Sequence, residues 1–291
     1  MKIPGSGAAG TFSLGDLTVN RLGYGAMRIV GKGVWGPPED KPSVLATLRR
    51  AIELGVNLID TADSYGPYTS EELIAEALYP YPPGLVIATK AGWERVGPGQ
   101  WIHNASPAHL TKALEGSLKR LRVERIDVYQ LHIPDPAVSF DASMETLAHL
   151  REQGKIRNVA LSNVALEYIE RARRIVPIVS VQNRYSFADR EWDYVVDYGE
   201  QHGIGFMPWA PLGQVRFASE ALDKAARELN ATPMQVGLAW LLKRSQNMLP
   251  IPGTSKVAHL EQNIAAASLE LPQSVYDELS AVTHNAKSLR G

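Results

Sequence analysis

The chain has 291 residues, and its 30 basic and 31 acidic side chains leave a formal net charge of -1. This balance disfavours partners recognised through bulk charge, so we expect no nucleic acid and no membrane surface as a partner. The absence of cysteine excludes disulfides, thiolate metal sites and cysteine nucleophiles. The sequence shows no apolar run long enough to cross a bilayer and no signal-peptide core. We therefore expect a cytoplasmic protein.

Short apolar segments alternate with helical patterns along the chain, which predicts a parallel sheet. Residues 11–19 resemble a hairpin that turns near Gly15 and Asp16. Strands are expected at 21–26, 56–60, 84–89, 126–131, 156–161, 178–182, 204–209 and 248–252. The first and last of these are weak by composition, and only the alternation supports them. The pattern predicts one α/β domain over residues 1–291, a (β/α)8 TIM barrel with a short N-terminal β-hairpin.

Four reactive side chains lie at, or just beyond, the C-terminal ends of predicted strands. Asp60 ends one strand, and Tyr65 follows five residues later. Lys90 and His132 directly follow two other strands. Because the C-terminal ends of barrel strands open onto one face, we expect these side chains to meet there. A free phenol has a pKa of about 10, and a nearby ammonium lowers it, so the group is suited to proton transfer.

Each of these residues also has a structural explanation when it is taken alone. Asp60 could cap a helix, and Lys90 could be a solvated or salt-bridged lysine. His132 could be a satisfied polar residue near the core, and Tyr65 a loop aromatic. Their common placement at one face of the predicted barrel favours a shared site.

Seven motifs, in order from about residue 12 to residue 284, make the sequence resemble the aldo-keto reductase superfamily. They are IDTADSYG (59–66), VIATKAG (86–92), RIDVYQLH (125–132), GKIRNVALSN (154–163), VQNRYS (181–186), PWAPLG (208–213) and IPGTSKVAHLEQN (251–263). The stretches GYGAM, VWGPPED and EALYPY are similar to a bacterial branch of that superfamily that includes pyridoxal reductases.

The resemblance implies a carbonyl reductase that uses NADPH or NADP+ and needs no metal. Tyr65 would be the general acid in reduction, with its pKa lowered by Lys90, which Asp60 holds. His132 would orient the carbonyl of a small-molecule substrate. A monomer or a weak homo-oligomer is expected.

The resemblance also implies a cofactor site across the barrel mouth. The GYGAMR stretch lacks the third glycine and the helix start of a Rossmann fingerprint, so no such site is expected there. The positions that the resemblance assigns to the cofactor are Gly25, Ala26, Met27, Asp60, Ser162, Asn163, Gln182, Trp209, Pro211, Leu212, Gly213, Gly253, Thr254, Ser255, Lys256, His259, Gln262 and Asn263. Ser162, Asn163 and Gln182 would hold the nicotinamide amide, and Trp209 would stack on its ring.

The choice between NADPH and NADH depends on the C-terminal motif. Many members of the superfamily carry lysine directly after Ile-Pro and arginine at a later position, where this chain has Gly253 and His259. Ser255, Lys256 and Asn263 still form a candidate pocket for a 2′-phosphate. NADPH is therefore favoured over NADH, although lysine lacks the rigid fork of arginine.

Trp35, Trp93 and Trp101 fall in predicted loops after the first and third strands and could form an aromatic substrate pocket. A packing role is as well supported for any one of them. We expect a small aromatic aldehyde as the substrate, with pyridoxal as the specific hypothesis. Two alternatives stay open: a Schiff-base aldolase or lyase that uses Lys90, and a non-catalytic NADPH-binding sensor or regulatory subunit.

Overall fold

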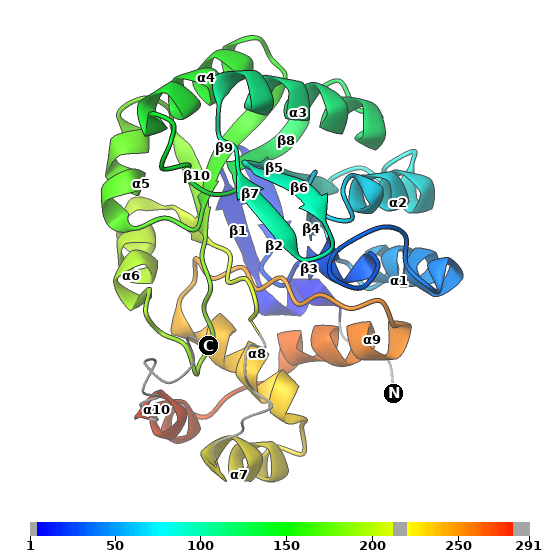
Figure 1. Cartoon of the computed structure of the whole chain (residues 1–291). Coiled ribbons are helices and arrows are strands. Elements are labelled where there is room, and N and C mark those ends of the chain that lie inside the picture. The colour runs from blue at the N-terminus through cyan, green and yellow to red at the C-terminus, as the bar shows by residue number, and fades with distance from the viewer. Residues whose placement is uncertain (1–4, 212–219, 282–291) are drawn as a thin grey trace.

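The computed structural model describes residues 5–211 and 220–281, in which parallel strands lie inside a ring of helices (Figure 1). Seven strands pair in the order β11-β10-β9-β8-β5-β4-β3. Their bounds are β3 (Tyr24–Gly25), β4 (Leu58–Asp60), β5 (Val86–Ala91), β8 (Ile126–Leu131), β9 (Ile156–Ser162), β10 (Ile178–Gln182) and β11 (Gly205–Phe206). Spatial order follows chain order, as in a βα barrel. The predicted fold class is confirmed.

The last predicted strand, 248–252, closes the barrel without forming a regular strand. Met248 makes one isolated parallel bridge to Phe206. On the other side, two glycine amides at the first strand donate to the carbonyls of Pro250 and Pro252 at 2.9 and 3.4 Å. Proline has no N–H, so this segment accepts hydrogen bonds but cannot sustain a full ladder. The strand prediction was wrong here, although the segment occupies the eighth position.

The boundaries of the other strands differ from the predictions mainly for the first and the seventh strand. The predicted strands 126–131 and 178–182 coincide with β8 and β10. The first and seventh predicted strands shrink to two residues each, β3 and β11. The third predicted strand lies two residues further along the chain, so that Lys90 belongs to β5 rather than following it.

The helices are α1 (Lys41–Glu53), α2 (Thr69–Leu78), α3 (Pro107–Leu121), α4 (Phe140–Glu152), α5 (Leu166–Arg173), α6 (Asp193–His202), α7 (Glu220–Glu228), α8 (Pro233–Arg244), α9 (Val257–Ala265) and α10 (Gln273–Ala281). Ser106 caps α3, and Thr232 forms a capping box at the start of α8. Because α1 packs against both α2 and α9, the first and last parts of the ring meet. Over the described ranges, no helix is long and apolar enough to cross a membrane.

The N-terminal hairpin closes the barrel at the N-terminal ends of its strands. β1 (Thr11–Leu14) and β2 (Leu17–Asn20) pair antiparallel around a turn at Gly15 and Asp16, as predicted. The hairpin shares one buried cluster with the inward-facing side chains of the strands, which comprises Leu14, Val19, Leu58, Val86, Ala88, Val128, Ala160, Met207 and Leu249. Asp16 pairs with Arg157 at 2.8 Å, and its hydrogen bonds lower the pKa of Asp16 to about 2. The barrel is therefore packed shut at the N-terminal ends of its strands.

A second hairpin follows β5, where the sequence predicted only a loop. β6 (Trp93–Gly97) and β7 (Gln100–His103) pair antiparallel around Pro98 and Gly99. The alternation of large and polar residues in this stretch is typical of such a hairpin. It places two of the predicted pocket tryptophans in regular structure beside the barrel mouth.

Replacing Leu14 by alanine tests whether the first hairpin stabilises the barrel. Leu14→Ala should lower the free energy of unfolding by about 2–5 kcal/mol, because it leaves a cavity in a fully buried cluster. Urea denaturation followed by circular dichroism measures the loss. Thr18→Ala, at an exposed position of the same hairpin, is the control and should change it by less than about 0.5 kcal/mol. Equal effects would contradict a plugging role.

Candidate active site

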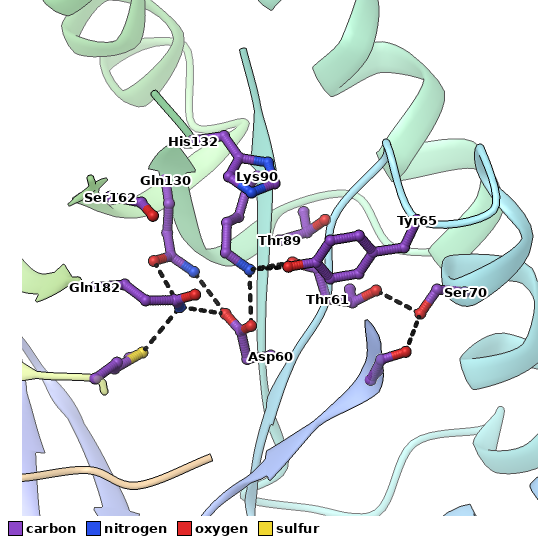
Figure 2. A network of polar contacts seen from close by, with 12 residues as sticks. Asp60, Thr61, Tyr65, Ser70, Thr89, Lys90, Gln130, His132, Ser162 and Gln182 are labelled. Atoms are coloured by element: carbon purple, nitrogen blue, oxygen red, sulfur yellow. Dashed lines mark hydrogen bonds and ion pairs between the residues drawn. The ribbon is translucent and has the colours of Figure 1, made fainter. Parts of the chain in front are cut away.

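A fully buried ion pair lies at the C-terminal ends of β4 and β5 (Figure 2). Side chains alternate along a strand, so Lys90 and Asp60 point inward like Ala88 and Leu58 two residues before them. Lys90 Nζ lies 2.7 Å from Asp60 Oδ2 and donates to the carbonyl of Thr61 at 2.8 Å. It also donates to the hydroxyl of Tyr65 at 3.5 Å. All three donors of the ammonium are therefore directed at oxygen atoms.

The second oxygen of Asp60 accepts two further hydrogen bonds. Gln130 Nε2 and Gln182 Nε2 each donate to Asp60 Oδ1 at 2.8 Å. Gln182 Nε2 also lies 3.3 Å from Gln130 Oε1. The carboxylate is thus held from both sides, as a buried charge requires. Gln130 was not predicted as a site residue, although its inward position two residues before His132 was a usable signal.

Tyr65 and His132 face each other beside the ion pair (Figure 2). Tyr65 lies between β4 and α2 and is only 6% exposed. Its ring centroid is 5.9 Å from that of His132, and the two rings are nearly perpendicular at 83°. The Nδ1 atom of His132 lies 3.5 Å from the hydroxyl of Ser64. The structure therefore brings together all four residues that the sequence predicted to meet.

Burial controls the protonation of these groups. Burial raises the pKa of Tyr65 above its usual value, and the opposing effect of the Lys90 ammonium does not cancel it. Burial, reinforced by the charge of Lys90, holds the pKa of His132 well below its usual range. Burial also acts against a charged Lys90, but the Asp60 carboxylate and the Tyr65 hydroxyl outweigh it and raise the pKa of Lys90. At neutral pH the site holds a neutral phenol, a neutral imidazole and an ammonium.

The pKa of Tyr65 differs from the expectation drawn from the sequence. Lys90 does act to lower it, as predicted, yet the net shift is upward because desolvation of the phenolate is the larger effect. The phenol therefore keeps its proton until a stronger base is presented to it.

Three predicted cofactor residues form one polar edge next to His132. Asn163, which has a left-handed φ of 57°, donates to Ser162 Oγ and to the carbonyl of His132, both at 3.0 Å. The indole of Trp209 donates to Asn163 Oδ1 at 3.0 Å. A further predicted cofactor residue, Gln182, adjoins this edge, because its carbonyl accepts a hydrogen bond from Asn163 N at 2.9 Å. Amide and hydroxyl groups of this kind can hold a carboxamide.

The GYGAM and IPGTS segments lie directly against each other. A Cβ at Gly25 would lie 2.5 Å from the carbonyl of Ile251, and one at Gly253 would lie 2.6 Å from the carbonyl of Gly25. A larger residue at either position would separate the two segments. In this chain the close approach therefore favours glycine at position 253. Tyr24 secures the contact, since its hydroxyl donates to the carbonyl of Thr254.

The remaining predicted cofactor positions lie around this contact. Ala26 and Met27 begin the 3-10 turn η2 (Ala26–Ile29), and Met27 is exposed. Lys256 precedes α9 at the N-cap position without a capping hydrogen bond from its side chain, and the helix carries the exposed His259 and Gln262 and the buried Asn263. The carbonyl of Ser255 accepts a hydrogen bond from Ser43. Pro211 is buried beyond Trp209, whereas Leu212 and Gly213 lie outside the described residues.

Arg28 is an exposed cation that the sequence reasoning did not select. Its Cγ lies 3.4 Å from where a Cβ at Gly253 would stand, so the stem of Arg28 covers the glycine. Among the residues that the structure describes, no hydrogen bond or ion pair engages its guanidinium. The basic residue directly after GYGAM was the available signal. In the same described ranges, no cluster of three or more His, Asp or Glu residues is arranged to hold a metal ion.

The aromatic side chains of the β6–β7 hairpin extend toward His132. Trp93 lies with its ring centroid 6.4 Å from that of His132 and 5.7 Å from that of Trp101. His103 contacts Trp93 edge-on at 4.4 Å. Trp35 joins this group through the guanidinium of Arg95 rather than through another ring. The three predicted pocket tryptophans therefore occupy one side of the mouth.

Residues 21–284 match the aldo/keto reductase family, and the chain therefore belongs to that family. It is an oxidoreductase. It is 44% identical over 283 residues to pyridoxine 4-dehydrogenase of Escherichia coli strain K12, which covers 95% of this chain and 99% of that protein. It is 46% identical over 273 residues to an uncharacterized oxidoreductase of Schizosaccharomyces pombe, covering 93% of this chain and 89% of that protein.

Solved structures show the same architecture. The glycerol dehydrogenase of Gluconobacter oxydans superimposes with a TM-score of 0.82 at 26% identity, covering 94% of each chain. An aldo-keto reductase of Klebsiella pneumoniae in complex with NADPH gives 0.78 at 26% identity, covering 92% of this chain and 93% of that one. The resemblance noted in the sequence is thereby confirmed.

The low pKa of His132 predicts a loss of stability on acidification. A histidine in the unfolded chain binds a proton near pH 6.5, whereas the buried imidazole does so only at a lower pH. Below about pH 6.5 the unfolded state therefore binds more protons, and the free energy of unfolding falls with decreasing pH. Urea denaturation at about pH 7.5 and about pH 5.5 should show a smaller fall for His132→Gln than for the wild type. Equal falls in the free energy of unfolding for the variant and the wild type would contradict a depressed pKa of His132.

Proposed function

We propose that the protein reduces an aldehyde or ketone to the alcohol with NADPH and catalyses the reverse oxidation with NADP+. One observation carries the proposal: Lys90 Nζ lies within hydrogen-bond distance of both the Asp60 carboxylate and the Tyr65 hydroxyl. A cation fixed beside a buried phenol stabilises the phenolate that forms when the phenol gives up its proton. This arrangement is suited to a general acid that works on a substrate oxygen.

The proton that completes the reduction would come from Tyr65 Oη. Its raised pKa keeps the phenol protonated at neutral pH, so the proton is present when a carbonyl arrives. As negative charge develops on the carbonyl oxygen, that oxygen becomes a stronger base than the phenolate beside Lys90. In the reverse direction, the phenolate would remove the proton from the alcohol.

His132 would orient the carbonyl by donating a hydrogen bond to its oxygen. The imidazole is neutral, since burial and Lys90 depress its pKa. A neutral donor can bind the carbonyl oxygen without competing with Tyr65 as the acid. The ring of His132 lies close to that of Tyr65, with centroids 5.9 Å apart, so both could reach one carbonyl oxygen.

The reduced nicotinamide, when bound, supplies a hydride to the carbonyl carbon. Ser162, Asn163 and Gln182 would hold its carboxamide, and Trp209 would pack on its ring. The fit is supported by their placement, because Asn163 bonds to both Ser162 and Trp209 at the edge of the Asp60 network. The Klebsiella pneumoniae relative was solved with NADPH, which supports the same choice here.

A flat aromatic aldehyde is the substrate class that the surroundings favour, with pyridoxal as the specific candidate. Trp93 lies beside His132 and contacts both Trp101 and His103, and aromatic side chains of this kind pack favourably on planar rings. The name of the Escherichia coli relative, pyridoxine 4-dehydrogenase, indicates chemistry on a substrate of this shape.

The Schiff-base alternative finds no support in the site. An amine must lose its proton to attack a carbonyl, whereas Lys90 is fully buried, bound to Asp60 and has a raised pKa. The sensor alternative predicts cofactor binding with slow turnover, which the following experiment distinguishes.

Removing one hydroxyl tests the proton donor. Tyr65→Phe should lower kcat for aldehyde reduction by about 100-fold or more, because general acid catalysis contributes that much. The absorbance of NADPH in the presence of pyridoxal and a panel of aldehydes measures turnover, and quenching of protein fluorescence measures cofactor binding. Binding should stay unchanged. Slow turnover by the wild type that Tyr65→Phe does not reduce would support the sensor instead.

Arg28 should distinguish the two dinucleotides. We expect Arg28→Gln to weaken NADPH binding about tenfold and NADH binding little, since a charge-assisted bond to the 2′-phosphate would be lost. Fluorescence titration with both cofactors, and with adenosine 2′,5′-bisphosphate against adenosine 5′-diphosphate, measures the effect. Lys112→Gln removes an exposed charge on α3 and serves as the control. Equal weakening of NADH would contradict a 2′-phosphate contact.

A further inference from the structure

Arg95, in the middle of β6, directs every N–H of its guanidinium at a backbone carbonyl. Its Nε donates to Gln100 at 3.0 Å, and Nη2 donates to Gly33 at 3.0 Å and to a second carbonyl of its own hairpin at 3.4 Å. Its Nη1 donates to Val34 at 2.8 Å and to Ser64 at 2.9 Å. An arginine has five N–H donors, so none is left over. In the described part of the chain, no carboxylate pairs with it.

These carbonyls belong to three separate segments around the mouth. One is the hairpin itself, one is the loop at residues 33–34, and one is Ser64, next to Tyr65. Val34 is held at a φ of 54°, a left-handed conformation that costs energy for a β-branched residue. Its carbonyl accepts from Gly66 N at 3.1 Å as well as from Arg95. Arg95 therefore fixes a strained loop against the segment that carries Tyr65.

The same guanidinium organises the aromatic side chains. It lies 3.7 Å from the ring centroid of Trp101 and 5.6 Å from that of Trp35. Arg95 and Trp101 are direct cross-strand partners, and so are Trp93 and His103. Cross-strand partners share one face of a hairpin, so Arg95 lies on the same face as the rings that approach His132.

An arginine at the mouth of a site is often a ligand for an anionic substrate. Here, a phosphate or carboxylate could bind to Arg95 only by breaking bonds to carbonyls that would then lack a partner. The geometry therefore argues against direct recognition of a substrate anion by this residue.

We infer that Arg95 is a positioning residue. It holds the rings of Trp93 and Trp101, which together form an aromatic wall, against the active site. It thereby sets selectivity for flat aromatic carbonyls over small aliphatic ones. The inference rests on the proposed carbonyl reduction. It assigns Arg95 no contact with the reacting atoms. Its effect is on how tightly a planar substrate is held, because planar rings pack favourably against aromatic side chains.

The test compares Arg95→Met and Arg95→Lys with Arg49→Met. Arg49 also donates to a backbone carbonyl, that of Ala77 at 3.2 Å, but it lies on α1 in the outer ring. Steady-state kinetics with NADPH are measured for benzaldehyde and for propanal, and near-ultraviolet circular dichroism reports the packing of the tryptophans. Methionine keeps an apolar stem against Trp101 and removes all five donors, whereas lysine keeps the charge with only three.

Arg95→Met is expected to raise KM for benzaldehyde about tenfold more than KM for propanal, whereas any change in kcat that arises through the Tyr65 segment should be the same for both aldehydes. Arg95→Lys should fall between Arg95→Met and the wild type, and Arg49→Met should match the wild type. A general structural defect would lower kcat/KM for both aldehydes by the same factor. That result, or an unchanged ratio of the two KM values, overturns the inference.

The spectrum separates this inference from the proposed function. If the wild type reduces neither these two aldehydes nor pyridoxal, the proposed reduction fails, and substrate selectivity has no meaning for this protein. A tryptophan spectrum altered by Arg95→Met but not by Arg49→Met would then support only the role of Arg95 in holding the wall. An unaltered spectrum would overturn that role as well.

Discussion

The buried pair of Lys90 and Asp60 is the constraint on which the rest of the site depends. Removing two charges from water costs several kcal/mol per ion unless geometry and further hydrogen bonds compensate. Here the ammonium is directed at three oxygens, and the carboxylate accepts from two glutamines as well as from the lysine. The pair is therefore satisfied on all sides, and the Lys90 ammonium adds its charge to the effect of burial on His132 and opposes the effect of burial on Tyr65.

The barrel makes this possible by dividing its interior into two layers. At the N-terminal ends of the strands, the inward side chains are apolar, and the first hairpin covers them. At the C-terminal ends of the same strands, the inward-facing side chains are polar: Asp60, Lys90, Gln130 and Gln182. The apolar layer excludes water from below, so the polar layer above it works at low dielectric, where its charges act more strongly.

The mouth is completed by segments that are not part of the strand ring. The β6–β7 hairpin, the loop at residues 33–34 and the α9 region each approach one side of the polar layer. Two contacts hold them. Glycines at positions 25 and 253 let two backbones touch, and Arg95 joins three segments through carbonyl groups. In both contacts the atoms approached are main-chain carbonyls, which every residue carries, so the sequence did not show which of them would be met.

The sequence by itself determined the order of the strands, the first hairpin and the four residues that meet at the mouth, because alternating strand and helix patterns and the common direction of parallel strands indicate where the strand ends converge. Tertiary structure decided the rest. It replaced the eighth strand with a proline-rich closing segment, added Gln130 to the Asp60 network and Arg95 to the mouth, and reversed the net pKa shift expected for Tyr65. These outcomes depend on burial and on distances between segments far apart in the chain, and local sequence patterns contain neither.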